Sequence, residues 1–68
     1  MEKDISNLLK QAITHHKKGD LTQAENLYME ILKIEPSHPD SNHNMGVLAS
    51  SVGKYKESIL FFEKAVKS

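Results

Sequence analysis

The stretch HHKKGDLTQAENLYMEILKIEP, from His15 to Pro36, contains a charged turn, a helix start, an apolar stripe and a proline stop. Gly19 can adopt the left-handed conformation that closes a helix, and Asp20 can cap the helix that follows. Asp20 and Gln23 have the spacing of a reciprocal capping box, with a neutral amide in place of the usual glutamate. Pro36 cannot continue this helix, because proline has no backbone N–H. The stretch therefore predicts the turn and the second helix of a helical hairpin.

Four apolar stripes with helical spacing run along the chain, one on each side of Gly19 and one on each side of Gly53. Pro39 suits the first position of the third helix, where its missing N–H is harmless, and either Ser37 or His38 can cap that helix. The pattern predicts two helical hairpins and an all-α fold. The members of the stripes are Ile5, Leu8, Leu9, Ala12 and Ile13; Leu21, Ala24, Leu27, Tyr28, Ile31 and Leu32; Met45, Leu48, Ala49 and Val52; and Tyr55, Ser58, Ile59, Phe62, Ala65 and Val66.

The two predicted hairpins repeat one another. A shift of 34 residues places Gly19 on Gly53 and brings together residues of similar size and polarity class at other positions. These other pairs are Ala12 with Gly46, Leu21 with Tyr55, Ala24 with Ser58, Tyr28 with Phe62, and Leu32 with Val66. Small residues permit close helix crossing, and aromatic residues fill the space beside them. A 34-residue period built from two helices is the signature of the tetratricopeptide repeat.

The chain resembles two tandem tetratricopeptide repeats, at about Ile5–His38 and Pro39–Ser68. The residues at the family's diagnostic places are Leu8, Ala12, Gly19, Ala24, Tyr28, Pro36, Met45, Gly46, Gly53, Ser58, Phe62 and Ala65. Three residues depart from the family pattern. His15 stands where a tyrosine or leucine is usual, Ile31 where alanine is usual, and Asn42 where a large apolar residue is common. The resemblance implies two antiparallel helix hairpins stacked as a short right-handed α-solenoid.

A finer resemblance covers HPDSNHNMGVLASSVGKYKESILFFEKAV, His38–Val66. It is similar to repeats of the O-GlcNAc transferase type, which read asparagine, a large apolar residue and a small one, here Asn44, Met45 and Gly46. In such repeats the asparagine faces the concave groove and holds peptide backbone, so the resemblance implies this role for Asn44. The start of the chain also resembles the N-terminal repeats of bacterial proteins that carry a transferase domain further on. The single domain, residues 1–68, is therefore expected to be a fragment of a longer protein.

The concave side supplies the candidate binding residues. Those expected to line it are Lys10, Ile13 and Lys17 in the first repeat, and His43, Asn44, Val47 and Ser51 in the second. Leu9 and Ile13 occupy the places where a carboxylate-clamp repeat needs lysine and asparagine, so an acidic chaperone tail is disfavoured as a partner. The predicted function is a protein-interaction module that binds an extended peptide or a partner helix. The alternatives are a self-association element and the substrate-recruiting arm of a larger bacterial transferase.

The composition argues against several other classes of protein. Nine lysines balance nine acidic residues and there is no arginine, whereas a nucleic-acid binder normally has a basic surplus. The start, MEKDISNLLK, carries charges on both sides of a very short apolar run and does not read as a secretory signal. No apolar run approaches the length of a membrane span. The absence of cysteine excludes disulfides and thiolate zinc sites. A cytoplasmic module that binds protein, and neither nucleic acid nor membrane, is predicted.

The four histidines do not have the spacing of a metal site. Two ligands on one helix face need a separation of three or four residues, but His15 and His16 are adjacent, and His38 and His43 are five residues apart. We expect a half-buried His15 and three solvated rings. The side chains within His38–Ser41 are too close along the chain to converge as a catalytic triad, and no phosphate-binding loop is present. Neither a metal, a cofactor nor enzymatic activity is therefore predicted.

The last helix contains four large apolar residues in a row, from Ile59 to Phe62. Because a helix turns by about 100° per residue, four consecutive side chains cannot all face one core. Phe62 is expected to pack inside its own hairpin, which leaves some of Ile59, Leu60 and Phe61 for another surface. The first repeat has Glu25 and Asn26 where the second has Ile59 and Leu60. This contrast predicts self-association through the last helix.

Overall fold

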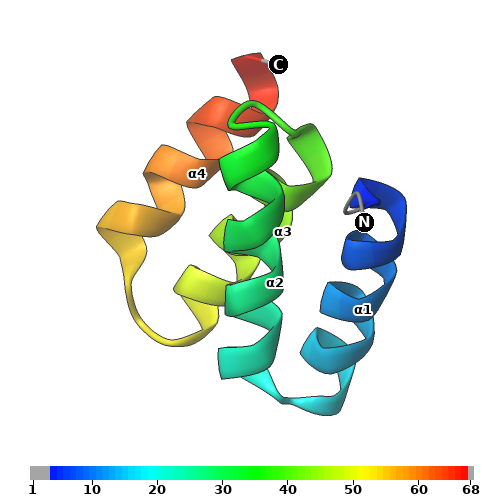
Figure 1. Ribbon diagram of the computed structural model, residues 1–68. Helices are drawn as coiled ribbons and strands as arrows, with labels where there is room; N and C mark the ends of the chain where they lie inside the picture. The colour runs from blue at the N-terminus through cyan, green and yellow to red at the C-terminus, as the bar shows by residue number, and fades with distance from the viewer. Residues whose placement is uncertain (1–3, 68) are drawn as a thin grey trace.

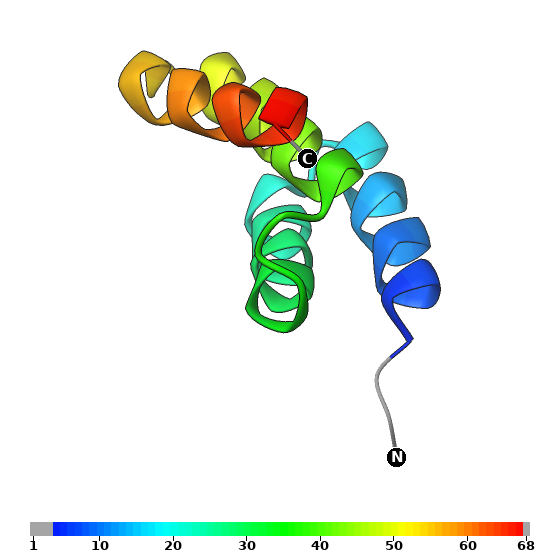
Figure 2. The same cartoon turned by 90° about the horizontal axis from the view of Figure 1, so that it is seen from above.

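A computed structural model describes residues 4–67, and within them the backbone forms helices and no strand. The chain folds into two antiparallel hairpins stacked side by side (Figure 1), so the prediction of an all-α helical repeat is confirmed. Figure 2 shows the helices from above, with α1 and α4 at the two sides of the molecule. The helices are α1 (Ile5–Lys18), α2 (Leu21–Ile34), α3 (Pro39–Ser51) and α4 (Tyr55–Lys67). Within residues 4–67, no helix combines the length and the apolar character that crossing a membrane requires.

The two hairpin turns have the same hydrogen-bonded geometry, 34 residues apart. Gly19 and Gly53 have φ values of 85° and 83°, in the left-handed region that side chains disfavour. The backbone N–H that follows each glycine donates to the carbonyl five residues before it, at 2.9 Å for Asp20 to His15 and 2.8 Å for Lys54 to Ala49. These bonds satisfy carbonyls that the end of a helix leaves unpaired. The turn predicted from the glycines is therefore present in both repeats.

Gly19→Val is expected to lower the free energy of unfolding by about 1–2 kcal/mol, which is the cost of left-handed backbone for a residue with a Cβ. A Cβ at Gly19 would have no heavy atom within 4 Å, so the penalty comes from the backbone and not from a clash. Urea unfolding followed by circular dichroism measures the loss. Gly19→Asn is the matched control, because asparagine tolerates this conformation better than valine. Equal losses in the two variants would contradict the explanation.

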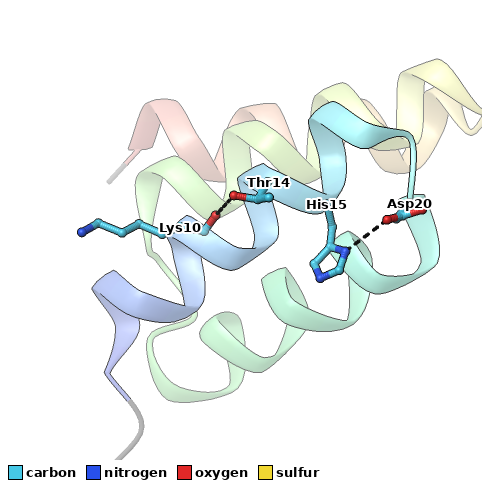
Figure 3. Close-up of polar contacts among 4 residues, drawn as sticks. All are labelled: Lys10, Thr14, His15 and Asp20. Carbon is cyan, nitrogen blue, oxygen red and sulfur yellow. Dashed lines mark hydrogen bonds and ion pairs between the residues drawn. The ribbon is translucent and has the colours of Figure 1, made fainter.

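The helix starts differ from the prediction at one position. Asp4 caps α1, because its carboxylate accepts the Ser6 N–H at 3.0 Å. His38 caps α3, because its Nδ1 accepts the Ser41 N–H at 3.2 Å, which decides between the two residues that the sequence left open. Asp20 precedes α2, but its side chain makes no cap hydrogen bond. The predicted capping box at Asp20 is therefore wrong, because the carboxylate turns to His15 Nδ1 instead, at 3.3 Å (Figure 3).

The core lies where α2 meets α1 and α3. Its buried members are Ala12, Ala24, Tyr28, Met45 and Leu48, with Leu9, Leu21, Leu27, Leu32 and Phe61 packed against them. Inside the second hairpin, a Cβ on Gly46 would lie 2.6 Å from Cε1 of Phe62, so only glycine allows the ring to sit against α3. Phe62 thus packs inside its own hairpin as predicted. This contact fixes how closely α3 and α4 approach.

Asn42 is buried completely, although it replaces the large apolar residue common at this place. Its Nδ2 donates to the Pro36 carbonyl at 3.1 Å, and its Oδ1 has no hydrogen-bond partner among the described residues. Leu8 occupies the equivalent place in the first repeat. The amide therefore ties the loop before α3 to that helix, at the expense of one buried acceptor.

Asn42→Leu is expected to raise the free energy of unfolding by about 1 kcal/mol, because it removes a buried acceptor that lacks a partner. The Pro36 carbonyl loses its donor, but Pro36 is exposed and water can replace the bond. Leucine can extend toward the adjoining hollow of about 190 Å³ beside Met29 and Phe61. Asn42→Asp, which is nearly isosteric, should destabilise instead, because it buries a carboxylate. Urea unfolding measures both changes. The account would be contradicted if the urea midpoints of both variants shifted in the same direction.

Candidate functional site

A hollow of about 300 Å³ opens between α1, α2 and α3. Its lining residues are Ile13, His16, Lys17, Tyr28 and Asn44. Three of them, Ile13, Lys17 and Asn44, are among the residues predicted to line the concave side. The hollow combines one apolar side chain, one cation and three groups able to form hydrogen bonds. It is therefore suited to a ligand that presents both polar and apolar groups.

The hydroxyl of Tyr28 is the centre of the polar part of this hollow. His16 Nδ1 lies 3.2 Å from the Tyr28 hydroxyl, and the two rings meet edge to face with centroids 5.9 Å apart. Burial raises the pKa of Tyr28, and a hydrogen bond from the Asn44 side chain works against this rise. The hydroxyl is therefore neutral at physiological pH and can donate a hydrogen bond.

Four residues predicted to bind peptide lie outside the lining of the hollow: Lys10 on α1, and His43, Val47 and Ser51 on α3. Lys10, Ile13 and Lys17 have the same spacing as Asn44, Val47 and Ser51, and each pair is related by the 34-residue shift. Residues three and four apart share one face of a helix. The two sets therefore form parallel stripes, which the hollow joins where Ile13 and Lys17 meet Asn44.

The predicted residues outside the hollow are exposed on α1 and α3. Lys10 is exposed, and its carbonyl accepts the Thr14 hydroxyl at 2.9 Å (Figure 3). Ser51 is exposed and donates its hydroxyl to the Leu48 carbonyl at 2.6 Å. Val47 is exposed. Their positions give them access to a long ligand, but nothing in the structure ties them to the hollow.

The histidines correct two expectations of the sequence. His15 is half-buried as predicted, but His16 and His38 are also partly buried and each forms a hydrogen bond, so the prediction of three solvated rings is wrong for both. His43 is exposed, with its ring 5.5 Å from that of Phe62. Within residues 4–67, no group of three histidine, cysteine or acidic side chains is arranged to hold a metal ion. His16 and His38 therefore have structural partners.

His16 and Tyr28 are the members of the hollow that the sequence did not identify. The sequence places Tyr28 in the core, which is correct for its ring, and it predicts a solvated His16. One signal was available: the equivalent of Tyr28 in the second repeat is Phe62, so only the first repeat carries a hydroxyl at this place. A hydroxyl at an otherwise apolar core position points to a polar neighbour.

A larger groove of about 470 Å³ runs between α2 and α4 over part of α3. Its apolar lining includes Met29, Met45 and Phe61, and none of the predicted peptide-binding residues lies in it. None of the polar side chains that line it is buried. We place the candidate site in the smaller hollow, because the partly exposed Asn44 amide there can fix the orientation of a ligand.

Two of the three α4 residues from which the predicted outer surface was to come are exposed. The third, Phe61, is partly buried and packs against the core. Ile59 and Leu60 are exposed by 58% and 59%. With about 100° per residue, these two side chains point in clearly different directions. They therefore face different sides of the exposed surface of α4.

Comparison with known proteins adds one match. A family model described as tetratricopeptide repeat matches residues 5–38 and 39–68, which together span almost the whole chain. No curated protein and no solved structure matches the chain. The finer resemblance to repeats of the O-GlcNAc transferase type therefore stays a prediction.

Proposed function

Because the chain belongs to the tetratricopeptide repeat family, we propose that it is a protein-interaction module that binds an extended peptide across α1 and α3. The observation that carries this proposal is the hollow in which Asn44 lies beside Ile13 and Lys17. The Asn44 amide offers both a donor and an acceptor to the backbone of an extended peptide.

The other residues of the hollow suggest what such a peptide contains. Ile13 offers an apolar contact for one side chain of the ligand, and Lys17 offers a positive charge beside it. Lys10 lies two turns before Lys17 on the same face of α1 and extends the positive charge along the groove. We propose a peptide with an apolar side chain near Asn44 and acidic side chains toward α1. No catalytic step is part of this function.

The test begins with selection of binding peptides from a displayed library of random sequences against the 68-residue chain. The selected peptide is then titrated into the ¹⁵N-labelled chain while the amide shifts are followed. We expect the largest shifts at Ile13, Lys17 and Asn44, and at the Tyr28 amide. Shifts confined to the groove between α2 and α4, around Met29, would contradict the proposed site. Failure to select any peptide would contradict the function itself.

The alternative as the substrate-recruiting arm of a larger transferase uses the same groove for the same contacts. It differs only in the domain to which the repeats would be joined. The proposal of peptide binding therefore holds under either reading. The alternative of self-association rests on a different surface, on α4.

A further inference from the structure

Helix α4 carries an apolar stripe in addition to its packing in the core. The stripe consists of Tyr55, Ile59, Phe62 and Val66, and we call it the C-terminal stripe. With about 100° per residue, these positions fall within roughly 60° of one another around the helix. Tyr55, Ile59 and Val66 are 66%, 58% and 83% exposed, while the ring of Phe62 borders them from its place against Gly46.

The equivalent face of the first repeat, on α2, is covered by other helices. The 34-residue shift relates the C-terminal stripe to Leu21, Glu25, Tyr28 and Leu32 on α2. Tyr28 is fully buried, and Leu21 and Leu32 pack against the core that α3 completes. This is the face that a following helix covers. On α4 no described residue covers it, and an isoleucine stands where α2 has Glu25.

The opposite end of the molecule does not fit the C-terminal stripe. Where α3 covers the first repeat, it uses Met45, Leu48 and Ala49, which are all buried. Their equivalents on α1 are Gln11, Thr14 and His15, which are polar. A second copy stacked head to tail would therefore bury these polar groups against the stripe. The best apolar match that a second copy offers is the same stripe, which makes a two-fold symmetric contact.

The spacing of the C-terminal stripe supports such a contact. The positions are four, three and four residues apart, which is the heptad spacing of a coiled-coil seam and reads the same from either end. In an antiparallel pair, Tyr55 meets Val66 of the second copy, and Ile59 meets Phe62 of the second copy. Each contact occurs twice. An aromatic residue therefore always faces an aliphatic one.

The charges beside the stripe fit the same arrangement. Lys56 and Glu63 lie on the same flank of α4, both exposed. They are seven residues and about 10 Å apart along the helix, too far to pair with each other. An antiparallel partner brings Lys56 close to Glu63 of the second copy. The same symmetry brings Glu63 close to Lys56 of the second copy, on the same side of the seam. We propose that two copies of this chain associate through the C-terminal stripe with their α4 helices antiparallel.

The first test is the mass of the chain across a concentration series, by light scattering or sedimentation. We expect the mass to rise from 7.7 kDa toward twice that value. Ile59→Glu should keep the chain monomeric at concentrations where the parent is dimeric, and glutamate is the residue at the equivalent place on α2. Leu60→Glu is the matched control, because Leu60 is equally exposed but points away from the stripe. It should leave the dimer intact.

Two results of this test would overturn the proposal. One is a parent chain that stays monomeric at millimolar concentration. The other is a dimer that Leu60→Glu abolishes and Ile59→Glu preserves, which would place the contact on the outer face of α4. Unfolding curves of both variants show whether each is still folded. A lower mass in a folded variant can then be attributed to loss of the dimer. The C-terminal stripe lies outside the hollow at Asn44, so dimerisation and peptide binding can fail separately.

The antiparallel arrangement has its own test, because the chain contains no cysteine. Tyr55→Cys and Val66→Cys variants are prepared separately and oxidised alone and as a mixture. We expect disulfide-linked dimers to form faster in the mixture than in either variant alone, since Tyr55 meets Val66 across the seam. Faster coupling of Tyr55→Cys with itself would indicate parallel helices and would overturn the arrangement.

Discussion

Gly46→Val is expected to lower the free energy of unfolding by about 3 kcal/mol, the upper end of what overpacking usually costs. The first added carbon would lie 2.6 Å from Cε1 and 2.7 Å from Cδ1 of Phe62, and the two methyl groups of valine need further room. Either α3 and α4 separate, or the ring leaves its place and loses its burial, which costs a comparable amount. A chain of 68 residues rarely has more than about 3–5 kcal/mol of stability. The variant should therefore be partly unfolded without denaturant, as measured by circular dichroism.

A double variant separates this explanation from a general intolerance of valine at position 46. Phe62→Ala removes the ring and destabilises the chain by itself, because a buried aromatic contact is lost. In Gly46→Val combined with Phe62→Ala the clash no longer exists. The double variant should therefore be less destabilised than the sum of the two single variants. Additive losses would show that Phe62 is not the cause.

The hairpins and their turns could be predicted from the sequence because their determinants are local. Gly19 and Gly53 each end a helix by supplying a backbone conformation, and no distant contact is needed for this. The apolar stripes have a period that depends only on helix geometry. The packing of Phe62 on Gly46 was also accessible, because the 34-residue shift sets aromatic beside small residues in both repeats.

The details that depend on competing partners could not be predicted. Asp20 has the right spacing to cap α2, but His15 lies near enough to attract the carboxylate, and the sequence does not say which contact is more favourable. The same holds for the neighbours of the Tyr28 hydroxyl, since His16 and Asn44 come from two other helices. The sequence leaves open which of Ile59, Leu60 and Phe61 remain exposed, because the groove between α2 and α4, which Phe61 lines, is created only when the hairpins stack.

The candidate site was predictable only in part for the same reason. The stripes on α1 and α3 follow from helical spacing and from the resemblance to tetratricopeptide repeats. The hollow that joins Ile13 and Lys17 to Asn44 follows from the angle between the hairpins, which depends on the whole core. Helical spacing places Ile59 on the C-terminal stripe and apart from Leu60 and Phe61. Which of these side chains the stacked hairpins leave exposed required the structure.

Asn44→Ala is expected to weaken binding of the selected peptide by about 1–3 kcal/mol, or about 5- to 150-fold, if the amide oxygen accepts a backbone N–H in the complex. The reason is that the peptide N–H would lose its hydrogen-bond partner in the complex. Isothermal titration calorimetry measures the change. The variant should remain folded, because Asn44 is only partly buried and the Tyr28 hydroxyl still has His16 Nδ1 within 3.2 Å.

Two further variants make this result specific. Asn26→Ala makes the same chemical change at an exposed position of α2, away from the hollow, and should leave the affinity unchanged. Tyr28→Phe keeps the ring and the core but removes the hydroxyl of a residue that lines the hollow with Asn44, so it should weaken binding less than Asn44→Ala does. Normal affinity of Asn44→Ala would show that the amide does not hold the ligand. An affinity loss in Tyr28→Phe as large as in Asn44→Ala would mean that the amide contributes only when the Tyr28 hydroxyl holds it in place.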